Sequence, residues 1–441
     1  MKRLYEAPAY DTAWPDSHWR RSQPVPAPSP ALSGSATADV AVIGAGYAGL
    51  SAAHELVTRF GMDVAVLEAV QPGWGASGRN GGFCCLGGSK LSDKGIERRV
   101  GPEGARAFRA YQHAAIESVG AFIDGHGIDA RQGPEGETYL AHSAAAFAGL
   151  RAEAASEPGA RLIGPGELAG EGLSGPGFHG ALQVPVGFPL HPMAYVEGLA
   201  RVAMEAGVRI YGNSPVLHLA PKGDGWQLTT PEGEVTAKKV LVATNGYSSE
   251  DLPRWLAGRS LPVLSSILVT RPLTEDERQA QGFTSKVMAA DTRSLLHYFR
   301  HLPDGRFLFG MRAGSSAAPK AMAETRRRGR QHFEAMFPAW KGVATESEWA
   351  GFVCLTGSLA PYVGQVPQAP GLYAALGWHG SGVAPGSYGG RLAARLMAGA
   401  EAGIPALLST PPRRFPLPAF RRTGLALAYL AADLRDGTLP R

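Results

Sequence analysis

Cysteine is scarce in this sequence: only Cys84, Cys85 and Cys354 occur among 441 residues. Three cysteines cannot form the disulfide framework of small secreted domains, so we expect free thiols and a reducing compartment. No run of about 18 apolar residues is present, which argues against a transmembrane helix. Residues 1–6 also lack the apolar stretch that follows the positive charges of a signal peptide. The sequence therefore predicts a cytoplasmic protein.

Charge is also scarce. Charged residues make up 18 % of the chain, and the 43 basic and 38 acidic side chains nearly balance, at +5. Together with 44 % hydrophobic residues, this composition excludes a disordered protein. The densest basic run, residues 326–330, lacks interleaved aromatic residues and falls on a predicted helix, where it is typical of a solvated face. We therefore expect no nucleic-acid partner.

Glycine and proline are abundant, with 58 and 34 residues, and indicate many turns. The chain is longer than one hydrophobic core usually fills, which predicts two interleaved domains. Prolines over residues 15–36 predict an extended arm. A βαβ unit follows, with a strand at 40–43, a helix around 50–56 and a strand at 64–68. Further helices are expected over residues 103–126, 191–206 and 322–336.

The turn after the first strand carries the pattern G-x-G-x-x-G at residues 44–49. Its glycines permit a tight turn, a close approach of backbone to a pyrophosphate and a close helix–strand contact. The helix N-terminus attracts the phosphates, and an acid at the end of the second strand holds ribose hydroxyls and disfavours NADP. This pattern predicts dinucleotide binding by Gly44, Ala45, Gly46, Tyr47, Ala48, Gly49, Glu68 and Ala69.

Two distant segments favour FAD over NAD. Residues 239–246 predict a late strand that ends in a turn of small residues, suited to lying over a bound dinucleotide. Residues 376–383 open the last long helix, whose N–H groups can face the negatively charged edge of a flavin. Either segment alone is also typical of an ordinary helix cap. Together they predict cofactor contacts from Thr244, Gly377, Gly380, Ser381, Gly382 and Val383, and Val216 is a further predicted contact.

The run Gly-Trp-Gly-Ala-Ser-Gly-Arg-Asn-Gly-Gly at residues 73–82 carries a family resemblance. Further similar segments are 191–192, 296–300, 305–310, 349–364 and 414–416. With them the chain resembles the D-amino-acid-oxidase-like FAD oxidoreductases over roughly residues 38–435. The resemblance implies flavin contacts from Gly75, Ala76, Ser77, Arg79, Asn80, Gly81 and Gly82. Arg79 either pairs with the pyrophosphate or braces the loop.

The resemblance also implies the fold. It combines a doubly wound, Rossmann-like α/β domain for FAD, discontinuous in sequence, with a second, mixed-sheet α+β domain for the substrate. We expect an arm over residues 1–35, and the FAD-binding domain over 36–100, 160–250 and 360–410. The substrate domain is expected over residues 101–159 and 251–359, with a helical tail over 411–441.

The activity that the resemblance implies is oxidation of a small amine. In this family a C–H bond next to an amine nitrogen delivers a hydride equivalent to flavin N5. The imine then hydrolyses, and O2 is reduced to H2O2. The chain looks most like the gamma-glutamylputrescine oxidase group, so that amine or a related amino acid is expected. A dehydrogenase with another electron acceptor is the alternative, and a tRNA-modifying flavoprotein is a distant one.

The chain departs from the pattern of this group in three places. At residues 377–382, Gly-Trp-His-Gly-Ser-Gly replaces Gly-Tyr-Ser-Gly-His-Gly, so His379 and Ser381 exchange places relative to that pattern. His297 stands where the group has an acid. Gly351 stands where sarcosine oxidases attach FAD through cysteine, and Cys354 is offset from it. We therefore predict non-covalent FAD and no metal site, with Cys84 and Cys85 as small buried residues.

Catalytic candidates come mainly from the second domain. Tyr298 and Arg300 alternate on one predicted strand, so both side chains face the same side. Arg300 either binds a substrate carboxylate or pairs with an acid at the surface, and Arg312 is a second candidate. Further predictions concern two tryptophans and a histidine: Trp349 and Trp378 line the site, and His379 tunes the flavin or caps the following helix.

Overall fold

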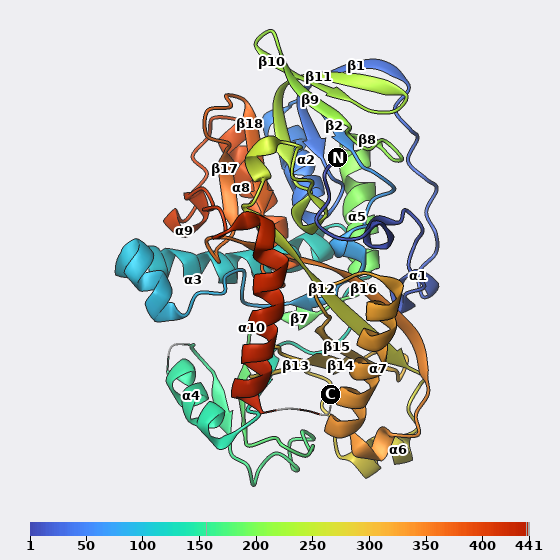
Figure 1. The fold of residues 1–441 in the computed structure, drawn as a ribbon, viewed down its shortest axis with the longest axis vertical. Helices are drawn as coiled ribbons and strands as arrows, with labels where there is room; N and C mark the ends of the chain where they lie inside the picture. Colours follow the sequence, from blue (N-terminus) through green and yellow to red (C-terminus); the bar gives the residue numbers. More distant parts are fainter. Residues whose placement is uncertain (156, 438, 440–441) are drawn as a thin grey trace.

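Two large sheets organise the molecule and lie one above the other along its long axis (Figure 1). This computed structural model describes residues 1–155, 157–437 and 439. The first sheet has the strand order β17-β18-β11-β1-β2-β8, and the β9–β10 hairpin continues it from β11. Its strands are β1 (Gly34–Ile43), β2 (Val64–Leu67), β8 (Arg209–Tyr211), β9 (His218–Lys222), β10 (Gly225–Thr229), β11 (Gly233–Val242), β17 (Tyr362–Gln365) and β18 (Leu372–Leu376).

The first sheet is buried on both faces. Its central strands β2, β1, β11 and β18 pair in parallel, and such sheets read as continuous apolar runs. One face packs against the helices α2 (Tyr47–Phe60), α5 (Pro192–Glu205) and α8 (Ala384–Met397), and the other against the hairpin residues Trp226 and Leu228. The predicted Rossmann-like domain is thereby confirmed, with a β-hairpin in place of helices on its second face.

The second sheet has the order β16-β12-β15-β14-β13-β4-β6-β5. Its pairs are antiparallel except β13 with β4. Its strands are β4 (Glu137–Leu140), β5 (Arg161–Ile163), β6 (Ala181–Val184), β12 (Ser260–Thr270), β13 (Met288–Asp291), β14 (Tyr298–His301), β15 (Phe307–Arg312) and β16 (Thr345–Thr356). The outer face packs an aromatic core of Phe299, Phe307 and Phe309 against α7 (Pro319–Met336). The inner face is left to meet the first domain.

Two domain boundaries differ from the prediction. Residues 160–184 were expected in the FAD-binding domain, but β5 and β6 pair with β4 in the second sheet. Residues 101–125 were expected in the substrate domain, but α3 (Asp93–Gly125), which kinks at Gly101, packs on the first domain. Its apolar face, with Phe108 and Tyr111, is buried there, and Tyr111 donates a hydrogen bond to Pro385 O. The helix therefore belongs to the first domain, because its apolar face is buried there, even though the chain enters the second domain soon after it.

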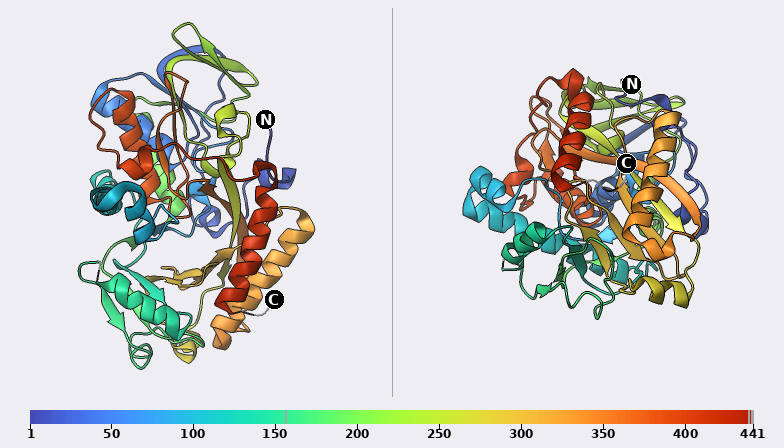
Figure 2. Two further views of the ribbon diagram at one scale, coloured as in Figure 1. Left: turned by 60° about the vertical axis from the view of Figure 1, so that its left-hand side comes forward. Right: turned by 60° about the horizontal axis from the view of Figure 1, so that its bottom comes forward.

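Shorter elements complete the described chain. β3 (Phe83–Cys84) pairs with β7 (Phe188–Pro189). The remaining helices are α1 (His18–Arg21), α4 (Ala144–Ala154), α6 (Glu275–Gln281), α9 (Ala406–Ser409) and α10 (Arg421–Asp436). The long helix α10, red in Figure 2, buries Leu425 against β12 and leaves Leu427 and Leu434 exposed. Among the described residues, no helix combines the length and apolarity needed to cross a lipid bilayer.

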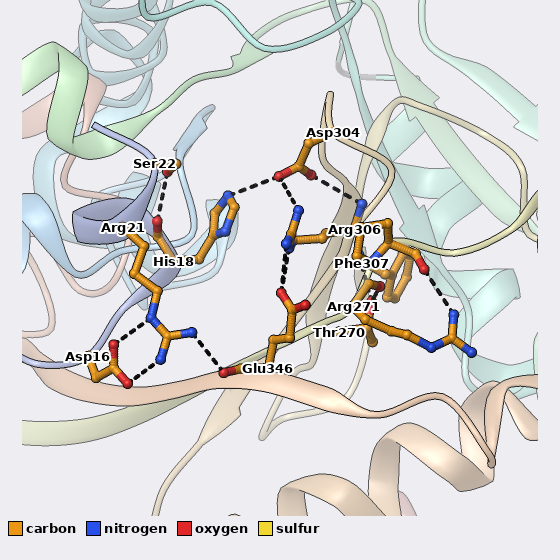
Figure 3. Close-up of polar contacts among 11 residues, drawn as sticks. Asp16, His18, Arg21, Ser22, Thr270, Arg271, Asp304, Arg306, Phe307 and Glu346 are labelled. Atoms are coloured by element: carbon orange, nitrogen blue, oxygen red, sulfur yellow. Dashed lines mark hydrogen bonds and ion pairs between the residues drawn. The ribbon is translucent and has the colours of Figure 1, made fainter. Parts of the chain in front are cut away.

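The prolines of the N-terminal arm predict an extended segment, but in the structure part of the arm packs against the folded domains. Short helix α1 docks on the second domain, where His18 lies 3.6 Å from Asp304 (Figure 3). Asp304 in turn pairs with Arg306, which also pairs with Glu346 of β16. Arg21 reaches the backbone O of the same Glu346 at 3.2 Å. Ion pairs and burial therefore hold an arm that composition alone marks as extended.

Trp19 anchors the arm, so we expect that its replacement destabilises the protein. Its side chain is fully buried, and its indole N–H donates to Asn80 O at 2.8 Å. We expect Trp19→Ala to lower the free energy of unfolding by about 3–5 kcal/mol, because a large cavity remains. Val25→Ala, at an exposed arm position, is the control and should stay within about 0.5 kcal/mol. Chemical denaturation measures both, and equal effects would contradict the anchor.

Candidate active site

One cavity of about 610 Å³ lies between the two domains, within the size range of small-molecule sites. Segments that the sequence analysis singled out separately meet around it. The predicted residues that line it are Gly44, Ala45, Gly46, Tyr47, Ala48, Glu68, Ala69, Gly75, Ala76, Ser77, Arg79, Asn80, Gly81, Val216, Thr244, Tyr298, Trp378, His379, Gly380, Ser381, Gly382 and Val383. Gly49, Gly82, Gly377, Arg300 and Trp349 lie outside this lining.

The β1–α2 turn has the geometry that the glycine pattern requires. Gly44 adopts φ +107°, a conformation that favours glycine. A Cβ at Gly49 would lie 2.0 Å from Gly44 O, so helix and strand approach too closely for any side chain. Ser77 Oγ lies 2.9 Å from the place of a Cβ at Gly46 and accepts the Tyr47 N–H. This cradle of backbone beside a helix N-terminus fits a pyrophosphate.

Glu68 stands at the end of β2, where the sequence predicts a ribose-binding acid. Its two oxygens accept the N–H groups of Ala45, at 2.8 Å, and Val70, at 3.1 Å. Burial raises the pKa of this carboxyl. Each carboxylate oxygen has capacity for a further donor, so the side chain both braces the glycine turn and remains able to accept ribose hydroxyls.

Arg79 braces its loop and keeps one nitrogen unused. Its Nε donates to Trp74 O at 2.8 Å and its Nη1 to Ala350 O at 3.3 Å. Its Nη2 is buried and has no hydrogen-bond partner among the described residues. A buried unpaired donor is costly, so an anionic ligand in the cavity fits this atom. Asn80, in contrast, is committed to its own loop, through Ser77 O and Gly82 N.

The pairing register of the second sheet selects the side chains that form the opposite wall. Tyr139, Ala290, Tyr298, Gly310 and Ile267 are direct partners across β4, β13, β14, β15 and β12. Direct partners project to the same face, and this row faces the cavity. Gly310 leaves room for the Tyr298 ring, because a Cβ there would lie 2.1 Å from it. The Tyr298 hydroxyl is 3.0 Å from Ser265 Oγ.

Arg312 lies opposite Ser265 and lines the cavity. Its Nη2 is 3.0 Å from the place of a Cβ at Gly380, in the turn before α8. No hydrogen bond or ion pair of its guanidinium occurs within the described residues, although Tyr298 and Ser265 lie beside it. An unpaired arginine in a cavity is suited to bind a carboxylate. Of the two arginines considered from sequence, Arg312 therefore has the better position.

Arg300 does not line the cavity, although the strand alternation suggested it as a carboxylate ligand. It does project to the same face as Tyr298, but it is fully buried outside the cavity. Its Nε donates to Gly81 O, and its Nη2 donates to Leu190 O and to the Gln132 side chain. Burial lowers its pKa to about 9. The side chain fixes the 80–82 loop, which explains why an alternation pattern alone misplaced it.

Trp349 and His379 also serve as supports. Trp349 is buried outside the cavity, and its indole N–H donates to Arg79 O at 2.8 Å. His379 borders the cavity, but both ring nitrogens are in use: Nε2 accepts the Thr356 N–H, and Nδ1 donates to Gly88 O. Trp378 packs against the glycines of α8 and presents one edge to the cavity. The role predicted for His379, to tune the flavin or to cap the following helix, stays a prediction.

Several lining residues carried no signal in the sequence. Lys90 projects into the cavity, where burial and the nearby Arg312 lower its pKa to about 8. Glu137 lines the same space and accepts a hydrogen bond from the Tyr139 hydroxyl at 2.7 Å. The N-terminal arm contributes Arg3 and Tyr10. None belongs to a motif, and only the long-range packing of strands and arm brings them here.

The sequence profile described as DAO, FAD dependent oxidoreductase, matches residues 39–396. The chain belongs to this family. Gamma-glutamylputrescine oxidoreductase of Escherichia coli (strain K12) is 31 % identical over 93 % of this chain and 95 % of its own length. Probable oxidoreductase OrdL of Rhizobium meliloti (strain 1021) is 32 % identical over 92 % of this chain and 94 % of its own. The protein is thus an FAD-dependent oxidoreductase.

Solved structures support the fold assignment. Glycine oxidase from Geobacillus kaustophilus superposes with a TM-score of 0.67 at 21 % identity, over 83 % of this chain and 96 % of its own. Iminodiacetate oxidase from Chelativorans sp. BNC1 gives 0.69 at 20 % identity, over 85 % of this chain and 100 % of its own. The cavity described above fits the FAD of this family through its glycine turn, the free nitrogen of Arg79 and the acid Glu68.

We predict that the flavin of this family member is released intact on denaturation. Cys84 is buried in the core, while Cys85 and Cys354 line the cavity. Burial raises the pKa of the Cys354 thiol to about 12, so it stays protonated at neutral pH, whereas the thiolate is the nucleophile. Acid precipitation should leave all yellow colour in the supernatant and the polypeptide mass unchanged. A flavin adduct on a Cys354 peptide would contradict this.

We predict that buried, neutral His379 lowers the free energy of unfolding of the protein in acid. Burial lowers its pKa to about 3, below its ordinary value near 6.5. The unfolded chain therefore binds the extra proton, and stability falls as pH drops below about 6.5. From pH 7.5 to pH 5 this one group should cost about 2 kcal/mol. His379→Asn lacks the group, so its deficit relative to wild type should shrink by that amount at pH 5. A deficit independent of pH would refute the neutral histidine.

Proposed function

We propose that this protein oxidises an amine that carries a carboxylate group, at the carbon next to its nitrogen, with O2 as the electron acceptor. The observation that carries the proposal is Arg312, an unpaired guanidinium in the cavity beside Tyr298. Similarity to a gamma-glutamylputrescine oxidoreductase at 31 % identity supports an amine of that kind. Gamma-glutamylputrescine, which has both groups, is the first candidate substrate.

The protein's own residues would bind and orient the substrate. When bound, FAD supplies the two-electron oxidation of the C–H bond next to nitrogen. Arg312 holds the carboxylate, with Lys90 as a second cation nearby. The apolar side chains Ile267 and Leu296 line the cavity beside Tyr298 and exclude water from the reacting carbon. A dry wall also favours the neutral form of the substrate nitrogen, which must lose its proton before oxidation.

An anaerobic titration tests the reaction class. Purified holoenzyme is mixed with gamma-glutamylputrescine, free polyamines, glycine, sarcosine and D- and L-amino acids, and the oxidised-flavin absorbance is followed. We expect bleaching by an amine with a carboxylate, and recovery of absorbance with formation of H2O2 when air is admitted. Recovery only with an added electron acceptor would contradict O2 as the acceptor. Absence of bleaching by every amine would contradict the proposed function.

We predict that Arg312→Met raises the KM for a carboxylate-bearing substrate by about tenfold to a hundredfold, because a charge-assisted hydrogen bond is lost. A substrate analogue without the carboxylate should react with unchanged kcat/KM. Arg327→Met, at an exposed helix position paired with Glu324, is the matched control and should have no effect. Steady-state kinetics measures all three. An equal loss for both substrates would mean that Arg312 is structural.

A further inference from the structure

Glu137 is a buried carboxyl group in the cavity that the proposed reaction does not use. It belongs to β4, lines the cavity and is only 4 % exposed. Its hydrogen-bond partners are the Tyr139 hydroxyl, at 2.7 Å, and the Cys85 thiol. Within the described residues no lysine, arginine or histidine forms an ion pair with it. A buried carboxylate without a paired cation is unfavourable, so a cationic ligand in the cavity would stabilise the ionised form of Glu137.

The described residues around Glu137 leave its carboxyl group without a charged partner. Its direct partners on the neighbouring strands are Met288 of β13 and Val184 of β6, which are both apolar. The titratable groups hydrogen-bonded to it are Tyr139 and Cys85, and burial raises the pKa of both. Lys90, in the same cavity, lies near Cys85. Burial likewise raises the pKa of Glu137 to about 7. The group is therefore ionised in slightly alkaline solution and attracts positive charge there.

The distance of Glu137 from Arg312 limits what can bind to both. Arg312 is on β15 and Glu137 on β4, with β14 and β13 between them. Glu137 lies in the pairing row of Leu308, four residues before Arg312 on β15. Three strand spacings across the sheet and this offset along the strand put the two backbones roughly 19 Å apart. Arg312 is close enough to Lys90 to lower its pKa. The cavity thus has an anion-binding end at Arg312 and a cation-binding end at Glu137, with Lys90 between them, near both Arg312 and the Cys85 thiol.

We propose that Glu137 is a specificity-determining residue that first binds the substrate's amine nitrogen in its ammonium form, remote from the carboxylate held by Arg312 and before the loss of the proton that oxidation requires. The inference rests on the proposed function and narrows its substrate class. In an α-amino acid, ammonium and carboxylate share one carbon and cannot reach both ends of the wall. The preferred substrate is instead an extended amine with its carboxylate at one end and a positive nitrogen at the other.

Ligand binding to the holoenzyme tests this without turnover. Calorimetry under anaerobic conditions compares 6-aminohexanoate with hexanoate, which has the same carboxylate and chain but no nitrogen. At pH 8 the wild type should bind the amino compound about tenfold or more tightly, because a buried charge pair forms. Glu137→Gln should abolish this preference and leave hexanoate binding unchanged. The preference should also weaken from pH 8 to pH 6, as Glu137 is protonated and 6-aminohexanoate stays cationic.

Two further variants separate binding from structure. Glu197→Gln removes another carboxyl group whose pKa burial raises to about 7, but Glu197 pairs with Arg20 away from the cavity. This variant should keep the full preference. Tyr139→Phe removes a hydrogen bond that lowers the pKa of Glu137, so the preference should persist, with its pH midpoint moved upward.

The outcomes distinguish this inference from the proposed function. If amines bleach the flavin but Glu137→Gln discriminates the two ligands as well as wild type does, only the role of Glu137 is overturned. The same holds if Glu137→Gln weakens hexanoate as much as 6-aminohexanoate, because that is a structural effect. If no amine bleaches the flavin of a correctly loaded enzyme, the proposed function itself is overturned.

Discussion

The register of the second sheet is the constraint on which the rest of the site depends. Direct pairing across β4, β13, β14, β15 and β12 puts Tyr139, Tyr298 and Ile267 on the face that meets the glycine turn. A slip of one residue would turn this whole set to the aromatic core and bring Phe299 and Phe309 to the cavity. The deep apolar packing of that core therefore also fixes the polar wall of the site.

The two domains divide the work at the cavity between them. The first domain supplies backbone: the turn at Gly44, the start of α2 and the 377–383 turn, all suited to a dinucleotide. The second supplies side chains, with a cation at one end and a carboxyl group at the other. Arg300 and Trp349 join the domains by holding the 79–82 loop. The N-terminal arm closes the assembly, since Trp19 bonds to the same loop through Asn80.

How far the sequence sufficed depends on how local each feature is. The βαβ unit with Glu68 is encoded within about thirty residues, and the structure has it where the sequence predicts it. Strand alternation showed that Tyr298 and Arg300 share a face, but it could not tell that a neighbouring loop captures one of them. Glu137 and Lys90 belong to no motif, and they reach the cavity only through pairing between distant segments. The arm's composition likewise concealed the burial of Trp19.

The central claim is that the flavin lies in the cavity between the domains and that the second sheet forms its substrate wall. A crystal structure of the holoenzyme with a bound carboxylate inhibitor tests this most directly. We predict density for the flavin ring between the 377–383 turn and Tyr298, with the inhibitor's carboxylate on the guanidinium of Arg312. A ring outside this cavity, or a carboxylate held by Arg300 in place of Arg312, would contradict the account.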